Sequence, residues 1–276
     1  MARLAYFIKK SSLVGSAQLS QLFSALESHG FSLYRVPCEG GIKSGTLALL
    51  SLGGDGTFLS AAPLAITSGL PIIGVNFGRL GFLAQTNASL LPQALQSGEY
   101  SLQERSLLEV KMDCECPESF FPYALNEVSV SRVSASMLGV DVKVDGVALP
   151  TYWADGLLVA TSTGSTAYSL SVGGPICTPD SKVSIIAPVS PHNLNVRPLI
   201  VPQDSRIDLR VQSRDSSSVF TMDNRNHIIP AGSHIEVTTS RRKLQRLCID
   251  KDNFFDALRT RLLWGSDVRN LNSSAD

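Results

Sequence analysis

Residues 46–57 read Thr-Leu-Ala-Leu-Leu-Ser-Leu-Gly-Gly-Asp-Gly-Thr, an apolar run that ends in three closely spaced glycines. The run Thr46–Leu52 is almost continuously apolar, which is typical of a strand covered on both faces of a parallel sheet. The glycine turn follows at once, and the next segment, Phe58–Ile66, has the apolar spacing of a helix. A buried strand, a glycine turn and a helix in this order predict one repeat of an α/β domain.

The same alternation of strand and helix continues on both sides of this stretch. A helix-period segment lies at 17–28, and strand-like runs lie at 4–8, 31–36 and 71–75. Parallel strands joined by crossover helices produce this pattern. We therefore expect residues 1–104 to form an α/β domain with a parallel sheet that carries the glycine turn.

After Ser101 the pattern changes to alternating strands, which predict a β-rich second domain at 105–250. Four prolines within 187–202 predict a rigid crossing segment in this domain. The segment 253–264 has helical spacing, and we expect this last helix to return to the first domain, which then also includes 251–276. The strand-like segments of the second domain are 107–112, 124–133, 140–144, 207–211 and 234–238.

The composition excludes several classes of protein. The chain has 276 residues, 43% of them hydrophobic, and its 24 basic and 24 acidic residues cancel, so no global field attracts nucleic acid. No apolar run approaches the roughly 18 residues that span a bilayer. Five scattered cysteines without a C-x-x-C pair fit a reduced, cytoplasmic setting without structural zinc, although Cys114 and Cys116 could bind a soft metal.

The glycine turn is suited to phosphate binding. Gly53, Gly54 and Gly56 let main-chain N–H groups approach a ligand without a Cβ in the way, and the following helix start favours an anion. The turn lacks the lysine and serine of a P-loop, and its spacing is not G-x-G-x-x-G. It therefore indicates phosphate chemistry of another kind.

Asp55 is the informative residue of the turn. A carboxylate beside phosphates is repelled unless it meets a metal ion or accepts a proton from an attacking hydroxyl, and both roles belong to phosphoryl transfer. The alternative is that Asp55 caps the helix that follows, as aspartate often does. The position of Asp55 alone does not decide between a base and a cap.

Two further segments have the chemistry of a polar ligand site. Eight of the eleven residues from Thr161 to Ser171 carry a hydroxyl, which suits a sugar phosphate or nucleotide, the alternative being a flexible linker. Asn126 and Glu127 could bind ribose hydroxyls or a base edge, or could lie on a solvated strand edge. The run Arg241–Lys243 is either solvent-facing or close to a phosphate, and the four histidines are too isolated for a metal site.

Taken together, these blocks resemble the NAD kinases, the ATP-dependent enzymes that phosphorylate NAD to NADP. The resemblance covers nearly the whole chain, and the hydroxyl-rich block distinguishes it from the lipid kinases and phosphofructokinases that share the GGDGT turn. The motifs are GGDGT at 53–57, GRLGF at 78–82, LNE at 125–127, the block 155–176, APVSPH at 187–192, RPL at 197–199, RRKL at 241–244 and the helix that ends near Gly265.

The resemblance implies a role for each of these blocks, in a cleft between the two domains. Asp55 would take the proton of the adenosine ribose 2′-hydroxyl, and the glycine turn with Thr57 would hold ATP phosphates with Mg²⁺. Asn126 and Glu127 would bind NAD, and Asp155 would lie near its nicotinamide half. Family resemblance also implies a homodimer or homotetramer. The remaining dinucleotide contacts would be Phe82, Thr163, Ser165, Thr166, Ala167, Tyr168 and Ser171.

One step departs from the family pattern. Members often carry Asp-Gly or Asp-His where this chain has Asp223-Asn224-Arg225, so Asn224 would contact the ligand instead. Two other functions stay open: a lipid or sphingoid kinase that uses the same turn, and a non-catalytic NAD(P) sensor in which Asp55 only caps a helix. The sequence leaves open the choice between ATP and polyphosphate as donor and between NAD and NADH as acceptor.

Overall fold

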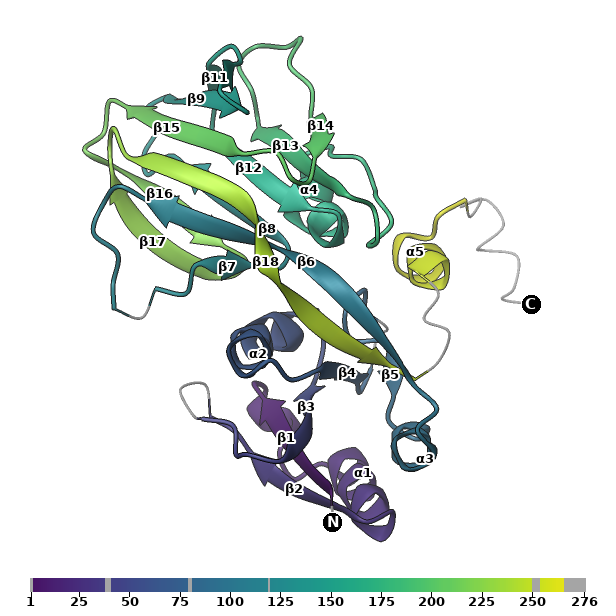
Figure 1. The fold of residues 1–276 in the computed structure, drawn as a ribbon. Helices are drawn as coiled ribbons and strands as arrows, with labels where there is room; N and C mark the ends of the chain where they lie inside the picture. Colours follow the sequence, from purple (N-terminus) through teal and green to yellow (C-terminus); the bar gives the residue numbers. More distant parts are fainter. Residues whose placement is uncertain (1, 38–40, 79–80, 119, 250–253, 266–276) are drawn as a thin grey trace. The chain divides into compact units, whose positions relative to one another are not determined.

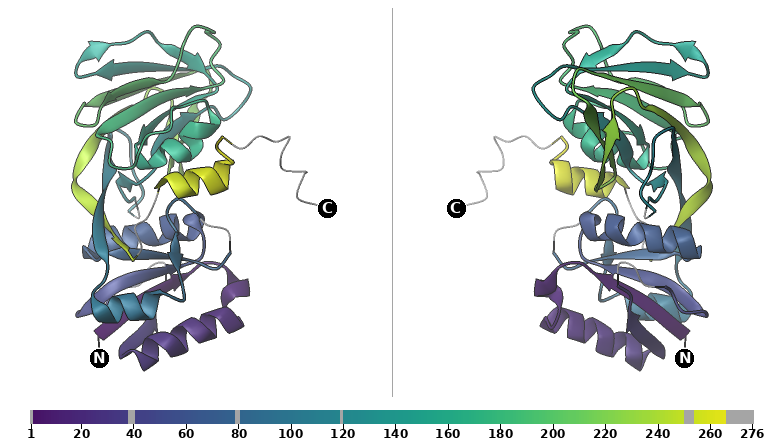
Figure 2. Two further views of the ribbon diagram at one scale, coloured as in Figure 1. Left: turned by 90° about the vertical axis from the view of Figure 1, so that its right-hand side faces the viewer. Right: turned by 90° about the vertical axis from the view of Figure 1, so that its left-hand side faces the viewer.

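The computed structural model describes residues 2–37, 41–78, 81–118, 120–249 and 254–265 (Figures 1 and 2). Over these residues the chain forms two compact units. The N-terminal unit consists of Met1–Glu104 with Gln245–Asp276, and the β-rich unit consists of Arg105–Leu244.

The N-terminal unit is a parallel sheet covered by helices on both faces, as the sequence predicted (Figure 2). Buried leucines of α1 pack on one face with α3, and Phe58 of α2 approaches Gly74 on the other. The strand order is β2 (Phe31–Arg35), β1 (Ala2–Ile8), β3 (Thr46–Leu52), β4 (Ile72–Asn76), with β5 (Thr86–Asn87) beside β4. The helices are η1 (Ser11–Leu13), α1 (Ala17–Ser28), α2 (Asp55–Ser68) and α3 (Leu91–Ser97).

The strand order places the glycine turn at a functional position of this sheet. The chain moves from β1 outward to β2 in one direction and from β3 to β4 in the other, so the order reverses between β1 and β3. In open α/β sheets, ligands bind outside the carboxyl ends of the strands at such a reversal. The turn that starts at Gly53 follows the carboxyl end of β3.

The helix α3 was not predicted, for a physical reason. Its seven residues are too few to show a 3.6-residue period, and it is defined by its ends instead. Pro92 occupies its first turn, and Gly98 ends it in a left-handed conformation at φ 75°.

The β-rich unit consists of two sheets packed around a common apolar core. The first has the order β10 (Val147–Ala148), β9 (Leu138–Val144), β15 (Ile207–Ser213), β18 (His234–Cys248), with β11 (Tyr152–Ala154) on β9. In the same sheet, β6 (Ser101–Met112) pairs with β18 and with β7 (Tyr123–Ala124). The second has the order β14 (Leu199–Pro202), β13 (Val183–Val189), β12 (Gly156–Thr161), β8 (Glu127–Ser131), β16 (Ser217–Met222), β17 (Arg225–Pro230).

Two predictions about this unit were wrong. Pro188 does not mark a crossing segment but lies inside β13, opposite Leu157 of β12, and β14 follows within the same proline-rich stretch. Strand β18 does not stop near residue 238 but continues to Cys248, so the basic run Arg241–Lys243 lies within a strand. Its far end pairs with the N-terminal unit's β4, where Arg246 lies opposite Ile72.

The last helix, α5 (Phe254–Leu262), belongs to the N-terminal unit, as predicted. The ring of Phe254 lies 6.0 Å from the ring of Phe82, which fixes the start of α5 against the segment that follows β4. Asn253, where the helix was expected to begin, lies outside the described residues. The predicted fold class, a parallel α/β unit, a β-rich unit and a returning final helix, is confirmed.

Candidate active site

The glycine turn has a backbone that only glycine adopts easily at its first position. Gly53 has φ +149°, its N–H donates to Val75 O at 2.9 Å, and a Cβ there would lie 2.5 Å from Thr57 Oγ1. Gly54 and Gly56 differ, because a Cβ at either would meet no atom within 4 Å. The two glycines therefore border open space, as a phosphate-binding turn requires.

Asp55 points away from the helix that it begins. Its carboxylate accepts three backbone N–H bonds from the next loop, from Phe82 at 2.9 Å, Leu83 at 3.0 Å and Ala84 at 2.9 Å. The N-cap of α2 is Gly54, and no side chain caps that end. The interpretation of Asp55 as a helix cap is therefore wrong.

Two glycines allow the loop to close on Asp55. A Cβ at Gly81 would overlap the Asp55 carboxylate, 2.7 Å from its Cγ and 2.9 Å from its Oδ2. A Cβ at Gly74 on β4 would lie 2.7 Å from both Ala84 Cα and Leu83 O. The carboxylate is thus positioned by close backbone packing. Arg79 and Leu80 of the predicted GRLGF motif lie outside the described residues.

A positive charge lies beside the turn, and no sequence motif indicated it. Lys9 follows the carboxyl end of β1, and its Nζ donates to Ser60 Oγ on α2 at 3.2 Å. Ser60 Oγ in turn donates to Gly56 O at 3.0 Å. Lys9 and Ser60, which are 51 positions apart, are brought together here by the pairing of β1 with β3.

In the β-rich unit, Asn126 and Glu127 lie at the start of β8 and are buried, with 7% and 8% of their surface exposed. Their side chains are not satisfied by the fold. Asn126 Oδ1 and Glu127 Oε2 have no hydrogen-bond partner among the described residues. Buried polar atoms of this kind indicate a place where a polar ligand binds. The alternative of a solvated strand edge is therefore wrong.

Asp223 fixes the backbone of this pair, a role that the sequence did not reveal. Its carboxylate accepts N–H bonds from Leu125 at 3.0 Å, Asn126 at 2.8 Å and Glu127 at 3.4 Å. Its own N–H donates to Glu127 O at 2.9 Å. Asn224, which was expected to contact the ligand, is exposed at the next position of the turn.

Burial and the neighbouring Asp223 carboxylate raise the pKa of Glu127 to about 8, and a hydrogen bond from the backbone of Tyr168 partly offsets this rise. A side chain that is normally a carboxylate is therefore mostly a neutral acid at pH 7. Perturbed pKa values of this kind are common at functional sites.

The hydroxyl-rich block is ordered, so the alternative of a flexible linker is wrong. It forms η2 (Thr163–Thr166) and α4 (Tyr168–Ser171) after β12. Several hydroxyls hold the block itself, because Thr161 Oγ1 donates to Leu125 O at 2.7 Å and Ser165 Oγ to Cys177 O at 3.1 Å. The buried Oγ1 of Thr163 has no partner among the described residues.

The block packs directly on the Asn126–Glu127 pair. The N–H of Thr161 donates to Asn126 O at 2.8 Å, and a Cβ at Gly164 would lie 2.8 Å from Asn126 Cα. Thr163, Thr166 and Tyr168 therefore belong to the same part of the unit as the pair. Ala167 lies between η2 and α4, and Ser171 is exposed at the end of α4.

Asp155 lies apart from this cluster. It precedes β12, whose first residue Gly156 pairs with Ser131, whereas Ala160 near the other end pairs with Glu127. Asp155 and Ala160 are five positions apart along this extended chain, a distance of roughly 16 Å. The Asp155 carboxylate forms an ion pair with Arg132 Nε at 2.8 Å. Its contact with a nicotinamide group stays a prediction.

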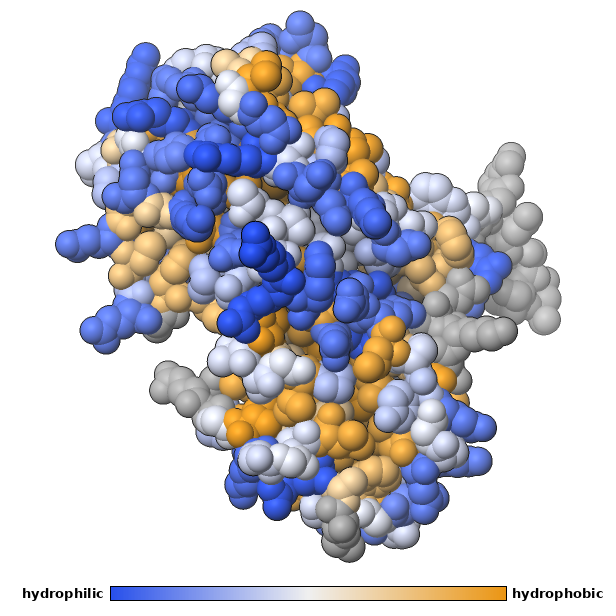
Figure 3. Space-filling view, viewed as in Figure 1, coloured by the Kyte–Doolittle hydropathy of each residue, from blue (hydrophilic) through white to orange (hydrophobic). Residues whose placement is uncertain are grey.

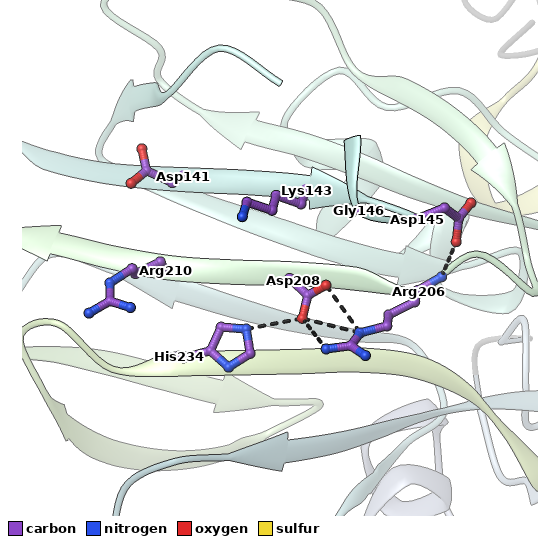
Figure 4. Close-up of a pocket in the computed structure, with 8 residues that line it drawn as sticks. All are labelled: Asp141, Lys143, Asp145, Gly146, Arg206, Asp208, Arg210 and His234. Carbon is purple, nitrogen blue, oxygen red and sulfur yellow. Dashed lines mark hydrogen bonds and ion pairs between the residues drawn. The ribbon is translucent and has the colours of Figure 1, made fainter. Parts of the chain in front are cut away.

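A separate hollow of about 760 Å³ lies on the outer face of β9, β15 and β18 and contains none of the predicted site residues (Figure 4). Its side chains neutralise one another, since Asp208 accepts from Arg206 Nη2 at 2.9 Å and lies 3.0 Å from His234 Nε2. This face is largely hydrophilic in Figure 3. We interpret it as the solvated face of an antiparallel sheet.

The described ranges contain no group of three or more His, Cys, Asp or Glu side chains that could hold a metal ion. Among the same residues, no helix combines the length and the apolar character that crossing a membrane requires.

Comparisons with known proteins identify relatives of this chain. Residues 37–99 match the family described as ATP-NAD kinase N-terminal domain, and residues 125–248 match ATP-NAD kinase C-terminal domain. The NAD kinase of Flavobacterium johnsoniae is 41% identical over 241 residues, which is 85% of this chain and 81% of that protein. The NAD kinase of Flavobacterium psychrophilum is 40% identical over 227 residues, which is 80% of this chain and 77% of that protein.

Two solved structures share the fold. Yeast NADH kinase in complex with NADH superposes with a TM-score of 0.82 at 22% identity, over 96% of this chain and 88% of that chain. An NAD kinase from Archaeoglobus fulgidus in complex with ATP superposes with a TM-score of 0.73 at 24% identity, over 93% of this chain and 96% of that chain. With the matched domains and the identity to its relatives, these findings show that the chain belongs to the NAD kinase family.

Proposed function

We propose that this protein transfers the γ-phosphoryl group of ATP to the adenosine ribose 2′-hydroxyl of NAD and so makes NADP. The 2′-oxygen bonds to the γ-phosphorus, the bond from that phosphorus to the β–γ bridging oxygen breaks, and the hydroxyl proton passes to Asp55. The observation that carries this assignment is the Asp55 carboxylate, fixed beside a glycine turn in a chain of the NAD kinase family. The proposal requires NAD to be held by residues of both units.

The hydrogen bonds of the Asp55 carboxylate leave one lone-pair position open, which can accept a hydrogen bond and then the proton of a hydroxyl. A carboxylate has about four lone-pair positions, and the loop 82–84 uses three of them, two on Oδ1 and one on Oδ2. The free position on Oδ2 can accept from a ribose hydroxyl. The rigid backbone donors keep the carboxylate aimed during the transfer, which is most of what a kinase base has to do.

The donor site is assigned to the turn and the start of α2. Gly54 and Gly56 would offer backbone N–H groups at the helix end to the phosphates. Gly53 and Thr57 would shape the turn around them, because the N–H of Gly53 donates to Val75 O and that of Thr57 to Gly54 O. We propose that Mg²⁺ enters with the triphosphate, since it usually binds through one or two carboxylates plus substrate phosphates. Bound there, it would neutralise charge on the β- and γ-oxygens.

The acceptor site is assigned to the buried polar atoms of the β-rich unit. Asn126 Oδ1, Glu127 Oε2 and Thr163 Oγ1 would meet the dinucleotide. The remaining contacts proposed there are Ser165, Thr166, Ala167, Tyr168 and Ser171, with Phe82 from the N-terminal unit. The Ser165 hydroxyl acts by holding the block, because it is already bonded to Cys177.

Replacing Gly56 by alanine tests whether this residue borders the donor phosphates, in a variant that should keep its stability. Gly56 lies in the first turn of α2 with open space around it, so the free energy of unfolding should stay the same or rise by up to about 1 kcal/mol. The added methyl group would face the donor phosphates, and we expect the KM for ATP to rise at least tenfold. Unchanged ATP kinetics in a stable variant would place the phosphates elsewhere.

Replacing Lys9 by glutamine should weaken donor binding, because the ammonium beside the turn is available to the phosphates. We expect roughly a tenfold rise in the KM for ATP, with the KM for NAD within twofold of wild type. Lys10 is the matched control, an exposed lysine at the next position. Equal effects of the two glutamine variants would show that Lys9 contributes only general charge.

A panel of donors and acceptors tests the proposed function itself. Purified protein with Mg²⁺ and ATP should convert NAD to NADP, and NADH and polyphosphate should be tried in the same series. Phosphorylation of a lipid alcohol or sphingoid base without NADP formation would favour a lipid kinase. Tight NADP binding without turnover on any donor would favour a sensor. Light scattering of the same sample tests the proposed homo-oligomer.

A further inference from the structure

We propose that Asp223 is a positioning residue for the dinucleotide, which fixes the backbone of residues 125–127 and keeps a proton on Glu127. Glu127 would then meet the dinucleotide as a neutral acid that donates a hydrogen bond to a ribose or base acceptor. This inference rests on the proposed function, in which Asn126 and Glu127 bind NAD.

The turn conformation of Asp223 directs its carboxylate toward the backbone of residues 125–127. It lies in the turn between β16 and β17 with φ 51°, a left-handed conformation that aspartate tolerates better than most residues. From there its carboxylate, with only 6% of the side chain exposed, receives three backbone N–H groups from the segment before β8. The turn at one edge of β8 therefore sets the conformation of the ligand-binding pair.

Only a carboxylate satisfies all three donors. Its two oxygens are both acceptors, and Oδ2 binds the N–H of Leu125 while Oδ1 binds those of Asn126 and Glu127. Asparagine has the same shape but replaces one oxygen by an NH₂ group, which would face a backbone N–H. Such a substitution leaves a buried backbone donor unsatisfied, which destabilises the segment 125–127.

The groups around Glu127 decide where the proton resides. Asp223 approaches from the β16–β17 turn, and the Arg225 guanidinium from β17 lies 4.0 Å from Asp223 Oδ2. Tyr168 of α4 presents its backbone N–H to the Glu127 carboxyl, and Ala160, opposite Glu127 on β12, carries no charge. The two buried carboxyls do not ionise independently, because the charge of Asp223 disfavours a second negative charge on Glu127.

The two carboxyls differ in how well their charge is compensated. Burial raises the pKa of Asp223, and its three amide donors and Arg225 act in the opposite direction. Glu127 receives one amide hydrogen bond, and its Oε2 has no partner among the described residues. The less compensated carboxyl, Glu127, is therefore the one that holds a proton, and its pKa is raised to about 8.

A definite pH dependence follows. If the dinucleotide binds the protonated acid, its affinity is full well below pH 8 and falls as the pH rises through about 8. The fall should approach tenfold for each further pH unit, roughly the effect of one required proton. A variant that lacks the Asp223 charge would lower the pKa of Glu127, and the fall would start at lower pH.

The test is NAD affinity by calorimetry from pH 6 to 9.5 for the wild type and three variants. In Glu127→Gln the amide donates at every pH, so affinity should no longer fall through pH 8. Asp223→Asn should bind more weakly at pH 7, with its fall displaced to lower pH. Asp145→Asn is the matched control, because Asp145 also has φ 51° in a turn and accepts a backbone N–H, from Arg206 at 2.8 Å.

Several results would overturn the inference. A wild-type affinity that is constant or rises with pH, together with much weaker binding by Glu127→Gln, would mean that Glu127 binds as an ionised acceptor. If NAD affinity depends on pH in the same way in Asp223→Asn and Asp145→Asn, Asp223 does not position the dinucleotide-binding pair. If Asp223→Asn does not fold, the pH profiles of the wild type and Glu127→Gln still decide where the proton resides. Failure of the wild type to bind NAD at any pH would overturn the proposed function as well.

Discussion

Replacing Asp55 by asparagine is expected to lower the rate of NADP formation by roughly 10²–10⁴-fold, the usual contribution of a general base. The amide keeps the size of the side chain but cannot take the proton of the 2′-hydroxyl. Steady-state turnover with saturating ATP and NAD gives the size of the loss. Because Asp55 is assigned to the reacting hydroxyl, the effect should appear in kcat, with NAD affinity within a few fold of wild type.

The Asp55→Asn substitution also changes the hydrogen bonds of this side chain, so the stability and the NAD binding of the variant must be measured as well. One of the three N–H groups of residues 82–84 would face the new NH₂ group, so the loop could lose order. Thermal unfolding and calorimetry with NAD therefore accompany the kinetics. A folded variant that binds NAD and keeps more than about a tenth of the wild-type rate would show that Asp55 is not the base.

Replacing Gly81 by alanine is expected to cause a loss of comparable size, although none of the proposed site residues is itself replaced. The new Cβ would overlap the Asp55 carboxylate, 2.7 Å from Cγ, in a loop in which Leu83 and Ala84 are buried. The carboxylate has to turn away or the loop has to move, and a displacement of about 1 Å can reduce a rate 10²-fold. Turnover and unfolding are compared in the same preparation.

The same loop supplies the control for this prediction. Gly78 lies three residues before Gly81. It is exposed, and a Cβ there would meet no atom within 4 Å. Gly78→Ala should therefore keep nearly full turnover. An active Gly81→Ala variant would mean that the close packing of this glycine on Asp55 is not needed for catalysis.

The α/β unit was predictable because its signals are local. The continuous apolar run of β3 and the helical apolar spacing of α1 can each be recognised within a single element. Both elements were found at the expected residues. Pro188 misled the prediction for the opposite reason. A proline removes one N–H from a strand, and whether the ladder tolerates that loss depends on its neighbours, here Leu157 on β12.

The site residues were found through their chemistry, but their roles depend on contacts distant in sequence. Asp55 alone could be a base or a cap, and only the loop 82–84 shows which groups its carboxylate meets. Asp223 acts on residues almost 100 positions away, with separations of 98, 97 and 96 for its three bonds. No local pattern encodes such a contact.

The hydroxyl-rich block illustrates the same limit. Its composition predicted a polar ligand, but composition cannot tell which hydroxyls the fold itself uses. Thr161 and Ser165 bond to backbone carbonyls, whereas Thr163 Oγ1 has no partner among the described residues. The backbone of η2 and α4 sets the direction of each side chain. This direction, and not the number of hydroxyls, decides which of them bond to the protein's own backbone.

The most direct measurement is phosphorus NMR of the product formed from ATP and NAD by the wild type and by Asp55→Asn. The account predicts one new phosphomonoester on the adenosine ribose 2′-oxygen with wild-type protein, and almost none with the variant over the same time. ATP consumption that does not depend on NAD, a phosphoryl group on another oxygen, or equal product from both proteins would contradict it.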